Sequence, residues 1–191
     1  MLHLASQSPR RRQLLEQLGI SHRVLDVVIA EVVMRNEPPA DYVRRVAREK
    51  AAAGLRALGA TANAVVLGAD TEVVLDGEVF GKPADAAAAR GMLLRLSGRS
   101  HTVLSAVCCM DASRAACVLS ITDVRFAMLD DAALTDYLAS GEWQGKAGAY
   151  AIQGRAGGFI THIAGSYTGV MGLPLHETAS VLAQFGIRPV S

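Results

Sequence analysis

The stretch that most constrains the fold is an unbroken run of apolar and small residues from Ala64 to Ala69. A continuous run of this length is typical of a strand that is buried on both faces, because a half-exposed strand alternates with polar residues. Both faces of such a strand need cover, which helices supply in α/β proteins. Asp70 follows the run directly, and ligands of open α/β sheets bind at the carboxyl ends of strands. The run therefore predicts a layered fold, with either a ligand-site carboxylate or a turn-capping aspartate at Asp70.

The rest of the chain alternates between strand and helix patterns. We expect strands over 2–5, 24–29, 64–69, 101–109, 115–126 and 159–164, a hairpin over 72–80, and helices over 9–18, 39–59, 84–96, 131–139 and 175–185. The hairpin is expected because Asp76-Gly77 is a strong signal for a two-residue turn. This order favours an α/β fold with a mixed sheet flanked by helices, in a single domain over residues 1–191.

Composition and charge exclude several classes of protein. Hydrophobic residues make up 51% of the chain and charged residues 19%, which is typical of a folded protein and not of a disordered one. A net charge of +1 argues against a broad surface for nucleic acid, and no apolar stretch approaches the ~20 residues of a membrane helix. The three cysteines lack the spacing of a metal site, and their odd number suits a reducing cytosol. We expect a cytoplasmic protein with no membrane association and no stable nucleic-acid partner.

Three arginines open the first expected helix, directly after Ser8 and Pro9. Ser8 is predicted to cap this helix, and Pro9 suits its first turn, where a missing N–H costs nothing. Arg10, Arg11 and Arg12 oppose the helix dipole, which favours negative charge at this end. An anion bound among the free N–H groups and the guanidinium groups would resolve the conflict, and a solvated basic turn is the alternative.

Two lysines stand at positions that call for an explanation. Lys50 lies in the apolar stripe of the helix that begins at Pro39, where a lysine either extends to water or meets an anion. Lys82 stands in a Gly-Lys-Pro turn, which lacks the spacing of a phosphate-binding P-loop. A solvated side chain remains the alternative to a functional one in both cases.

The segment 145–154 consists mainly of small, uncharged residues. Such a segment lets backbone N–H and C=O groups approach a planar ligand, and Gln153 offers both a donor and an acceptor. A close-packed loop without a ligand is the alternative.

Five ordered motifs resemble one known family. The segments 4–11, 68–71, 81–83, 97–101 and 172–174 read LASQSPRR, GADT, GKP, SGRSH and GLP. Their order and spacing are similar to those of the Maf proteins, the nucleoside triphosphate pyrophosphatases of the septum-formation-inhibitor family. Glu142, the segment KAGAYAIQG over 146–154 and the segment GSY over 165–167 resemble the branch that acts on dTTP and UTP.

The resemblance implies hydrolysis between the α- and β-phosphates of a nucleotide, which gives a nucleoside monophosphate and pyrophosphate. It implies a fold like that of the inosine triphosphate pyrophosphatases, with two lobes around a central cleft, and a homodimer. It also implies a house-cleaning role towards unwanted or modified nucleotides, with a link to septum formation. Alternatives are a Maf pyrophosphatase that prefers CTP, 7-methyl-GTP or a modified nucleotide, and a non-catalytic regulatory protein that binds nucleotides or nucleic acid.

The resemblance also assigns roles to particular residues. Asp70 matches the family's proton acceptor or metal-positioning carboxylate, and Arg10, Thr71 and Gln153 match positions linked to substrate choice. A divalent cation, Mg²⁺ or Mn²⁺, is implied, with Asp70 and Glu31 as its ligands. The polar cleft positions associated with phosphate and metal are Ser8, Arg11, Glu31, Lys50 and Lys82.

These roles agree with the chemistry of the side chains. The cations would offset negative charge that spreads over the phosphates in the transition state. The amide of Gln153 complements the imide edge of uracil or thymine. One departure stands beside Glu31, because the family usually carries a second acid where this chain has Ala30, which leaves one fewer metal ligand.

Overall fold

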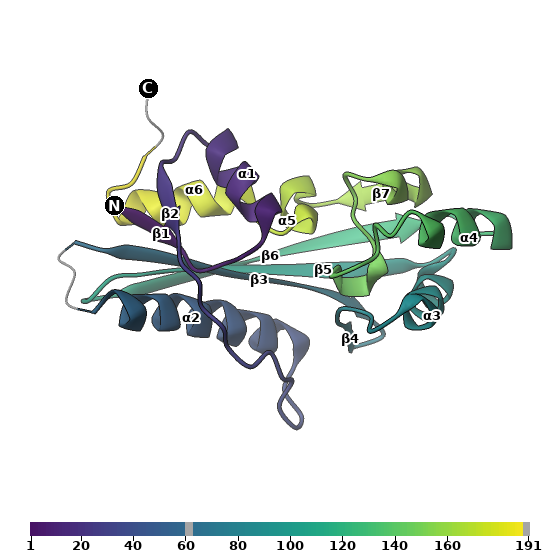
Figure 1. Ribbon diagram of the computed structural model, residues 1–191, viewed down its shortest axis with the longest axis horizontal. Helices are drawn as coiled ribbons and strands as arrows, with labels where there is room; N and C mark the ends of the chain where they lie inside the picture. Colours follow the sequence, from purple (N-terminus) through teal and green to yellow (C-terminus); the bar gives the residue numbers. More distant parts are fainter. Residues whose placement is uncertain (60–62, 189–191) are drawn as a thin grey trace.

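Seven strands form one mixed sheet in a computed structural model that describes residues 1–59 and 63–188. The strand order is β2-β1-β3-β5-β6-β7, and β4 pairs with β3 on the edge that β1 also uses (Figure 1). β1 is parallel to β2 and β3, whereas every other pairing is antiparallel. The strands are β1 (Leu2–Leu4), β2 (His22–Val24), β3 (Val65–Leu75), β4 (Glu78–Phe80), β5 (Ser100–Met110), β6 (Ala115–Phe126) and β7 (Ile160–Ala164).

Helices cover both faces of the sheet, which confirms the predicted α/β class. The long helix α2 lies along one face, and α1, α5 and α6 lie on the opposite face (Figure 1). The helices are α1 (Pro9–Gln17), α2 (Pro39–Leu58), α3 (Ala86–Leu96), α4 (Asp131–Ala139), α5 (Tyr167–Met171) and α6 (Leu175–Gln184), with short 3₁₀ turns η1 (Ala147–Ala149) and η2 (Arg155–Phe159). Within the described ranges, no helix has the length and apolar character needed to cross a membrane.

The position of β3 between these layers explains its unbroken apolar run. Leu67 packs into the core that β3 forms with α1 and α6, and Val66 packs into the core that it forms with α2. α2 lies directly on β3 because Gly68 has no side chain. A Cβ at Gly68 would collide with the backbone of Ala47 and Ala51 in α2. This close approach brings the next polar residue of β3 within reach of α2.

The predicted hairpin is confirmed, and its turn has the expected backbone. Asp76 and Gly77 both have positive φ, at 52° and 80°, as a tight two-residue turn between β3 and β4 requires. The segment 167–171, which lies between the expected strand 159–164 and the expected helix 175–185, forms the helix α5. Ser166 caps this helix by accepting a hydrogen bond from the N–H of Gly169, at 3.0 Å.

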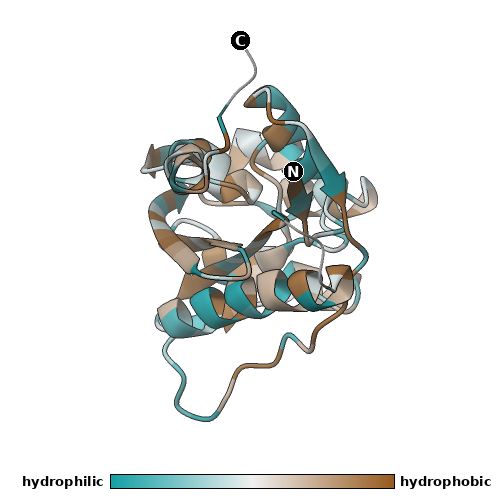
Figure 2. Cartoon of the chain, turned by 90° about the vertical axis from the view of Figure 1, so that its left-hand side faces the viewer, coloured by the Kyte–Doolittle hydropathy of each residue, from teal (hydrophilic) through white to brown (hydrophobic). Residues whose placement is uncertain are grey.

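The strand predicted over 24–29 is wrong. β2 ends at Val24 because its partner β1 offers only three residues for pairing. The chain from Leu25 to Pro38 runs as a loop beyond α2 (Figures 1 and 2), in which Val28 and Val32 are exposed. Val27 and Ile29 pack against the core of α2, which explains the apolar pattern that resembled a strand.

We predicted that Asp70 directly follows a strand, and this is wrong. Asp70 lies near the middle of β3. The strand continues because β5 pairs with it from Val66 to Val74. On the opposite edge, β1 pairs with residues 65–67 and β4 with residues 73–75. In the part of the chain that the structure describes, no strand covers residues 68–72 on that edge. This opening, and not a strand terminus, exposes Asp70 to a cavity.

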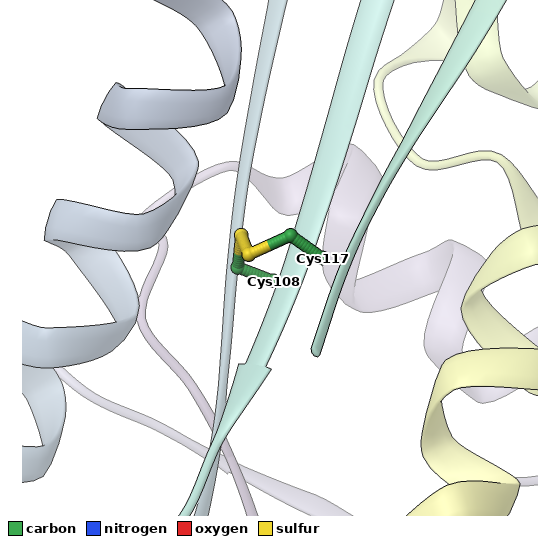
Figure 3. The surroundings of a disulfide bond; sticks show 2 residues. All are labelled: Cys108 and Cys117. Carbon is green, nitrogen blue, oxygen red and sulfur yellow. A yellow bond between two sulfur atoms is a disulfide. The ribbon is translucent and has the colours of Figure 1, made fainter. Parts of the chain in front are cut away.

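A disulfide joins Cys108 on β5 to Cys117 on β6 (Figure 3). The two residues are directly paired across the antiparallel ladder, with their Cα atoms 4.1 Å apart. Cys109 remains a free thiol and is buried. We predicted a reducing environment from the odd number of cysteines. Two of the three cysteines are nevertheless bonded, because the register of β5 and β6 places them opposite each other.

Candidate functional site

A cavity of about 640 Å³ opens at the uncovered edge of β3. This volume falls within the range of small-molecule sites in proteins. Side chains from both faces of the sheet, from the loop 25–38 and from the segment 145–154 form its walls. All nine residues predicted from the sequence line it: Ser8, Arg10, Arg11, Glu31, Lys50, Asp70, Thr71, Lys82 and Gln153.

Lys50 contacts two carboxylates on the α2 side of the cavity. Its Nζ lies 2.8 Å from Asp70 Oδ1 and 2.7 Å from Glu31 Oε1. The second oxygen of Glu31 accepts a hydrogen bond from Lys82 Nζ at 3.2 Å. Burial raises the pKa of Glu31, but the bonds to Lys50 and Lys82 outweigh it and lower this pKa below its usual value. Of the two alternatives predicted for Lys50, water or an anion, the structure shows an anion. The anions are the protein's own carboxylates, Asp70 and Glu31.

Arg11 lines the cavity from the other face of the sheet and donates to neutral acceptors. Its Nε donates to the carbonyl of Gly172 at 2.8 Å, and its Nη atoms donate to Ser6 Oγ and Thr71 Oγ1 at 3.2 and 3.4 Å. No carboxylate among the described residues forms an ion pair with Arg11. Arg10, one residue before it, has a buried Nε without a hydrogen-bond partner. The charges of Asp70, Glu31 and Glu72 nevertheless act on Arg11, because they oppose the lowering of its pKa by burial.

The predicted side-chain cap at Ser8 is absent from the described structure. Ser8 occupies the N-cap position, but its side chain accepts no hydrogen bond from the helix, and its N–H donates to Ser6 Oγ. Thr71, the other hydroxyl of the site, lies 2.9 Å from Ser105 Oγ on β5. The hydroxyls of Ser6 and Thr71 thus hold Arg11, and Ser8 lines the same cavity.

The segment 145–154 forms one wall of the cavity, with Gln153 exposed. Glu142 holds the turn that carries Gln153, since its Oε2 accepts a hydrogen bond from the N–H of Arg155 at 2.8 Å. At its other end, the segment packs tightly, and Gly148 leaves no room for a Cβ against Val73. The segment is close-packed against Val73 on one side and lines the cavity on the other. Its approach to a planar ligand stays a prediction.

Glu72 also lines the cavity, although the sequence analysis did not select it. It follows Asp70 by two residues and so lies on the same face of β3, a period-two signal that could have identified it. Burial raises the pKa of Glu72 to about 8, and the negative charges of Asp70 and Glu31 raise it as well. Lys82 and Lys50 oppose this shift without preventing it.

Cations outnumber acids in the cavity wall, a charge balance that favours an anionic ligand. The cationic side chains are Arg10, Arg11, Lys50, Lys82 and Lys146, against the acidic side chains Glu31, Asp70 and Glu72. The whole chain carries a net charge of only +1, so positive charge is concentrated here.

The donor set around Asp70 fits a hard divalent cation in part. No three His, Cys, Asp or Glu side chains of the described residues are already grouped as a metal site. Asp70 Oδ2, however, is buried and has no hydrogen-bond partner. Carboxylate oxygens are preferred ligands of Mg²⁺, which is often held by one or two carboxylates with phosphate oxygens and water completing the shell.

A mixed α/β fold with a cationic cavity around a buried carboxylate is the kind of structure that suits an anionic small molecule. The family model described as Maf-like protein matches residues 1–185, and this chain belongs to the Maf family. It is 55% identical over 186 residues to a nucleoside triphosphate pyrophosphatase of Xylella fastidiosa (strain M23), covering 97% of this chain and 98% of that protein. It is 53% identical over 188 residues to a dTTP/UTP pyrophosphatase of Xanthomonas axonopodis pv. citri (strain 306), covering 97% and 99%.

Among solved structures, the Ham1 protein of Staphylococcus aureus is similar to this chain with a TM-score of 0.42 and 13% sequence identity. The similarity covers 66% of this chain and 71% of Ham1.

Proposed function

We propose that this Maf-family protein is a nucleoside triphosphate pyrophosphatase that hydrolyses dTTP and UTP to the monophosphate and pyrophosphate. The names of its full-length relatives support this activity and these substrates. The observation that carries the proposal is the position of Asp70, whose unpartnered Oδ2 faces a cavity lined by five cationic side chains. A triphosphate needs such cations, and its hydrolysis needs a group that handles the water proton.

Each wall of the cavity has a part in the proposed reaction. Arg10 and Arg11 offset the charge that develops on the phosphate oxygens while the bond to the leaving pyrophosphate breaks. Lys50 holds Oδ1 of Asp70, so that Oδ2 is left either to accept the proton of the attacking water or to hold a divalent cation. A bound Mg²⁺ or Mn²⁺ would polarise the phosphate and neutralise its charge. Glu31 is the second metal ligand predicted from the sequence, and both of its oxygens contact lysines.

Gln153 selects the base in this proposal. Its side-chain amide has one acceptor and two donor hydrogens, which complement the alternating donor and acceptor groups on the imide edge of uracil and thymine. Its exposed position at the cavity wall supports this role, and Glu142 fixes the turn that carries it. Thr71 and Arg10 are the further residues predicted to influence substrate choice.

The position of bond cleavage tests the reaction. We expect ³¹P NMR of dTTP with Mg²⁺ and the protein to show dTMP and pyrophosphate, whereas dTDP and inorganic phosphate would contradict the proposal. In H₂¹⁸O, attack at the α-phosphorus places the label in dTMP. Label found in pyrophosphate would mean attack at the β-phosphorus instead.

We also propose a cytoplasmic homodimer with an inosine-triphosphate-pyrophosphatase-like architecture of two lobes around the cleft, acting in nucleotide house-cleaning. The proposed substrates belong to the nucleotide pools of the cell, which supports a cytoplasmic location. The Cys108–Cys117 disulfide counts against this location, because disulfides are rare in reducing compartments. Light scattering tests the assembly. A mass of twice the 20.1 kDa of one chain is expected, and the mass of a single chain would contradict it.

A further inference from the structure

Glu72 is a buried acid that forms no ion pair in the described structure. The residue is 7% exposed, and its Oε2 is buried without a hydrogen-bond partner. Buried polar atoms are nearly always hydrogen-bonded, so an unpartnered carboxylate oxygen at a cavity wall is available to a ligand. Asp70 is 4% exposed, and its Oδ2 is orphaned in the same way.

The two orphaned oxygens belong to one site. Asp70 and Glu72 are two residues apart on β3, so their side chains leave the same face of the strand, and both line the same cavity. The nearby lysines do not bridge Glu72. Lys50 contacts Asp70 Oδ1 and Glu31, and Lys82 contacts Glu31. Two further ionisable groups sense the charge of Glu72 without a hydrogen bond to it. It raises the pKa of Tyr42 on α2, as burial does, and it opposes the lowering of the Arg11 pKa by burial.

We propose that Glu72 and Asp70 together bind a divalent cation through Glu72 Oε2 and Asp70 Oδ2, with Glu72 as a ligand that the sequence did not reveal. A divalent charge would compensate two neighbouring buried acids that otherwise repel each other. Two carboxylates suffice for Mg²⁺ when phosphate oxygens and water complete the shell. The inference rests on the proposed function in this last respect, because the substrate phosphates are expected in the same cavity.

Binding of Mn²⁺, measured from the EPR signal of the free ion, tests the site without turnover. The titration is made on the full chain, alone and with a non-hydrolysable α,β-imido analogue of dTTP. We expect Glu72→Gln, which keeps the shape but removes the charge, to weaken Mn²⁺ binding at least tenfold. Glu72→Asp, which keeps the carboxylate, is expected to bind Mn²⁺ more tightly than Glu72→Gln.

Glu78→Gln is the matched control, because Glu78 lies on β4, is exposed and pairs with Arg95 outside the cavity. It is expected to bind Mn²⁺ as the wild type does. Equal affinities of the wild type and Glu72→Gln would overturn the inference, as would the absence of Mn²⁺ binding by the wild type with the analogue. Since no hydrolysis is measured, a failure of the proposed pyrophosphatase activity would be seen separately, as a lack of pyrophosphate release.

Discussion

Lys50 on α2 reaches the middle of β3 and places its Nζ 2.8 Å from Oδ1 of Asp70. The Asp70 side chain is buried, at 6% exposed, and the Lys50 side chain is mostly buried, at 12% exposed, so the ion pair lies largely between the helix and the sheet. The pair makes the two oxygens of Asp70 different, because Oδ1 is bonded and Oδ2 is free at the cavity wall. Much of the proposed chemistry depends on that difference.

Loss of Lys50 is predicted to destabilise the protein. Lys50→Met leaves the buried carboxylate of Asp70 without its partner, which costs about 3–5 kcal/mol when one member of a buried pair is removed. Lys82→Met is the control, since the Lys82 side chain is 60% exposed and its pair with Glu31 is expected to contribute under about 1 kcal/mol. Urea unfolding of both variants measures the difference. Equal free energies of unfolding would contradict this role of Lys50.

Changes at Gln153 are predicted to alter base preference more than phosphate chemistry. Gln153→Ala removes the amide, and Gln153→Glu replaces its donor with a second acceptor, so discrimination among dTTP, UTP and CTP should fall. The ratios of kcat/KM for these nucleotides measure the effect. Gln144→Ala, at an exposed residue outside the cavity, is the control. Unchanged ratios in both Gln153 variants would remove Gln153 from substrate choice.

The disulfide predicts the number of reactive thiols. Denatured protein without reductant should show one thiol per chain, from Cys109, and three after reduction. The two bonded cysteines have a sequence separation of 9, so the disulfide closes a short loop. Its reduction should therefore lower the free energy of unfolding by about 2–3 kcal/mol. Three thiols before reduction would show that the bond does not form under the conditions of purification.

His101 is predicted to make stability depend on pH. It is 3% exposed and lies 2.8 Å from the hydroxyl of Tyr150, which lines the cavity. Burial lowers the pKa of His101 to about 4 in the folded state, below the value of about 6.5 in the unfolded chain. The unfolded state therefore binds the proton first, so stability is fully present above pH 6.5 and declines as the pH falls towards 4.

Urea unfolding at pH 4.5 and 7 measures this dependence. Between pH 7 and 4.5, the free energy of unfolding of the wild type should fall by on the order of 2–3 kcal/mol more than that of His101→Gln, which has no titrating ring at this position. Thr102→Val, at the neighbouring position of β5, serves as a control that keeps His101. The same loss in the wild type and His101→Gln would contradict the prediction.

Periodicity predicted the bounds of a helix well where the helix faces one core. The helices near 9–18 and 131–139 match the structure within a residue or so, because the apolar residues of each pack into a single core cluster. The strand at 115–126 also matches, although its apolar residues pack against more than one core. The strand at 24–29 failed for a tertiary reason. Its apolar residues pack on α2 without a strand to pair with, which no local pattern can show.

The sequence predicted which residues line the cavity, but it did not predict how they are arranged. Asp70 was selected as a residue after a strand, whereas it lies within β3, where the edge is uncovered between β1 and β4. That opening depends on where β1, which is about 60 residues away in sequence, pairs with β3, and on how far the β3–β4 hairpin extends. Glu72 was missed because an acidic residue in a strand is usually expected to face solvent. Only the structure shows that it lines the cavity. The functional roles came from a resemblance, since side-chain types alone left Lys50 and Lys82 undecided.

Pyrophosphate release from dTTP by the wild type and by Asp70→Asn tests the central claim most directly. The substitution keeps the size of the side chain but removes the charge that accepts a proton or holds the cation, so we predict that turnover falls by at least a thousandfold while circular dichroism shows the folded protein. CTP and 7-methyl-GTP assayed in parallel should be hydrolysed more slowly than dTTP and UTP. Wild-type turnover in a folded Asp70→Asn protein, or no release from any nucleotide by the wild type, would contradict the account.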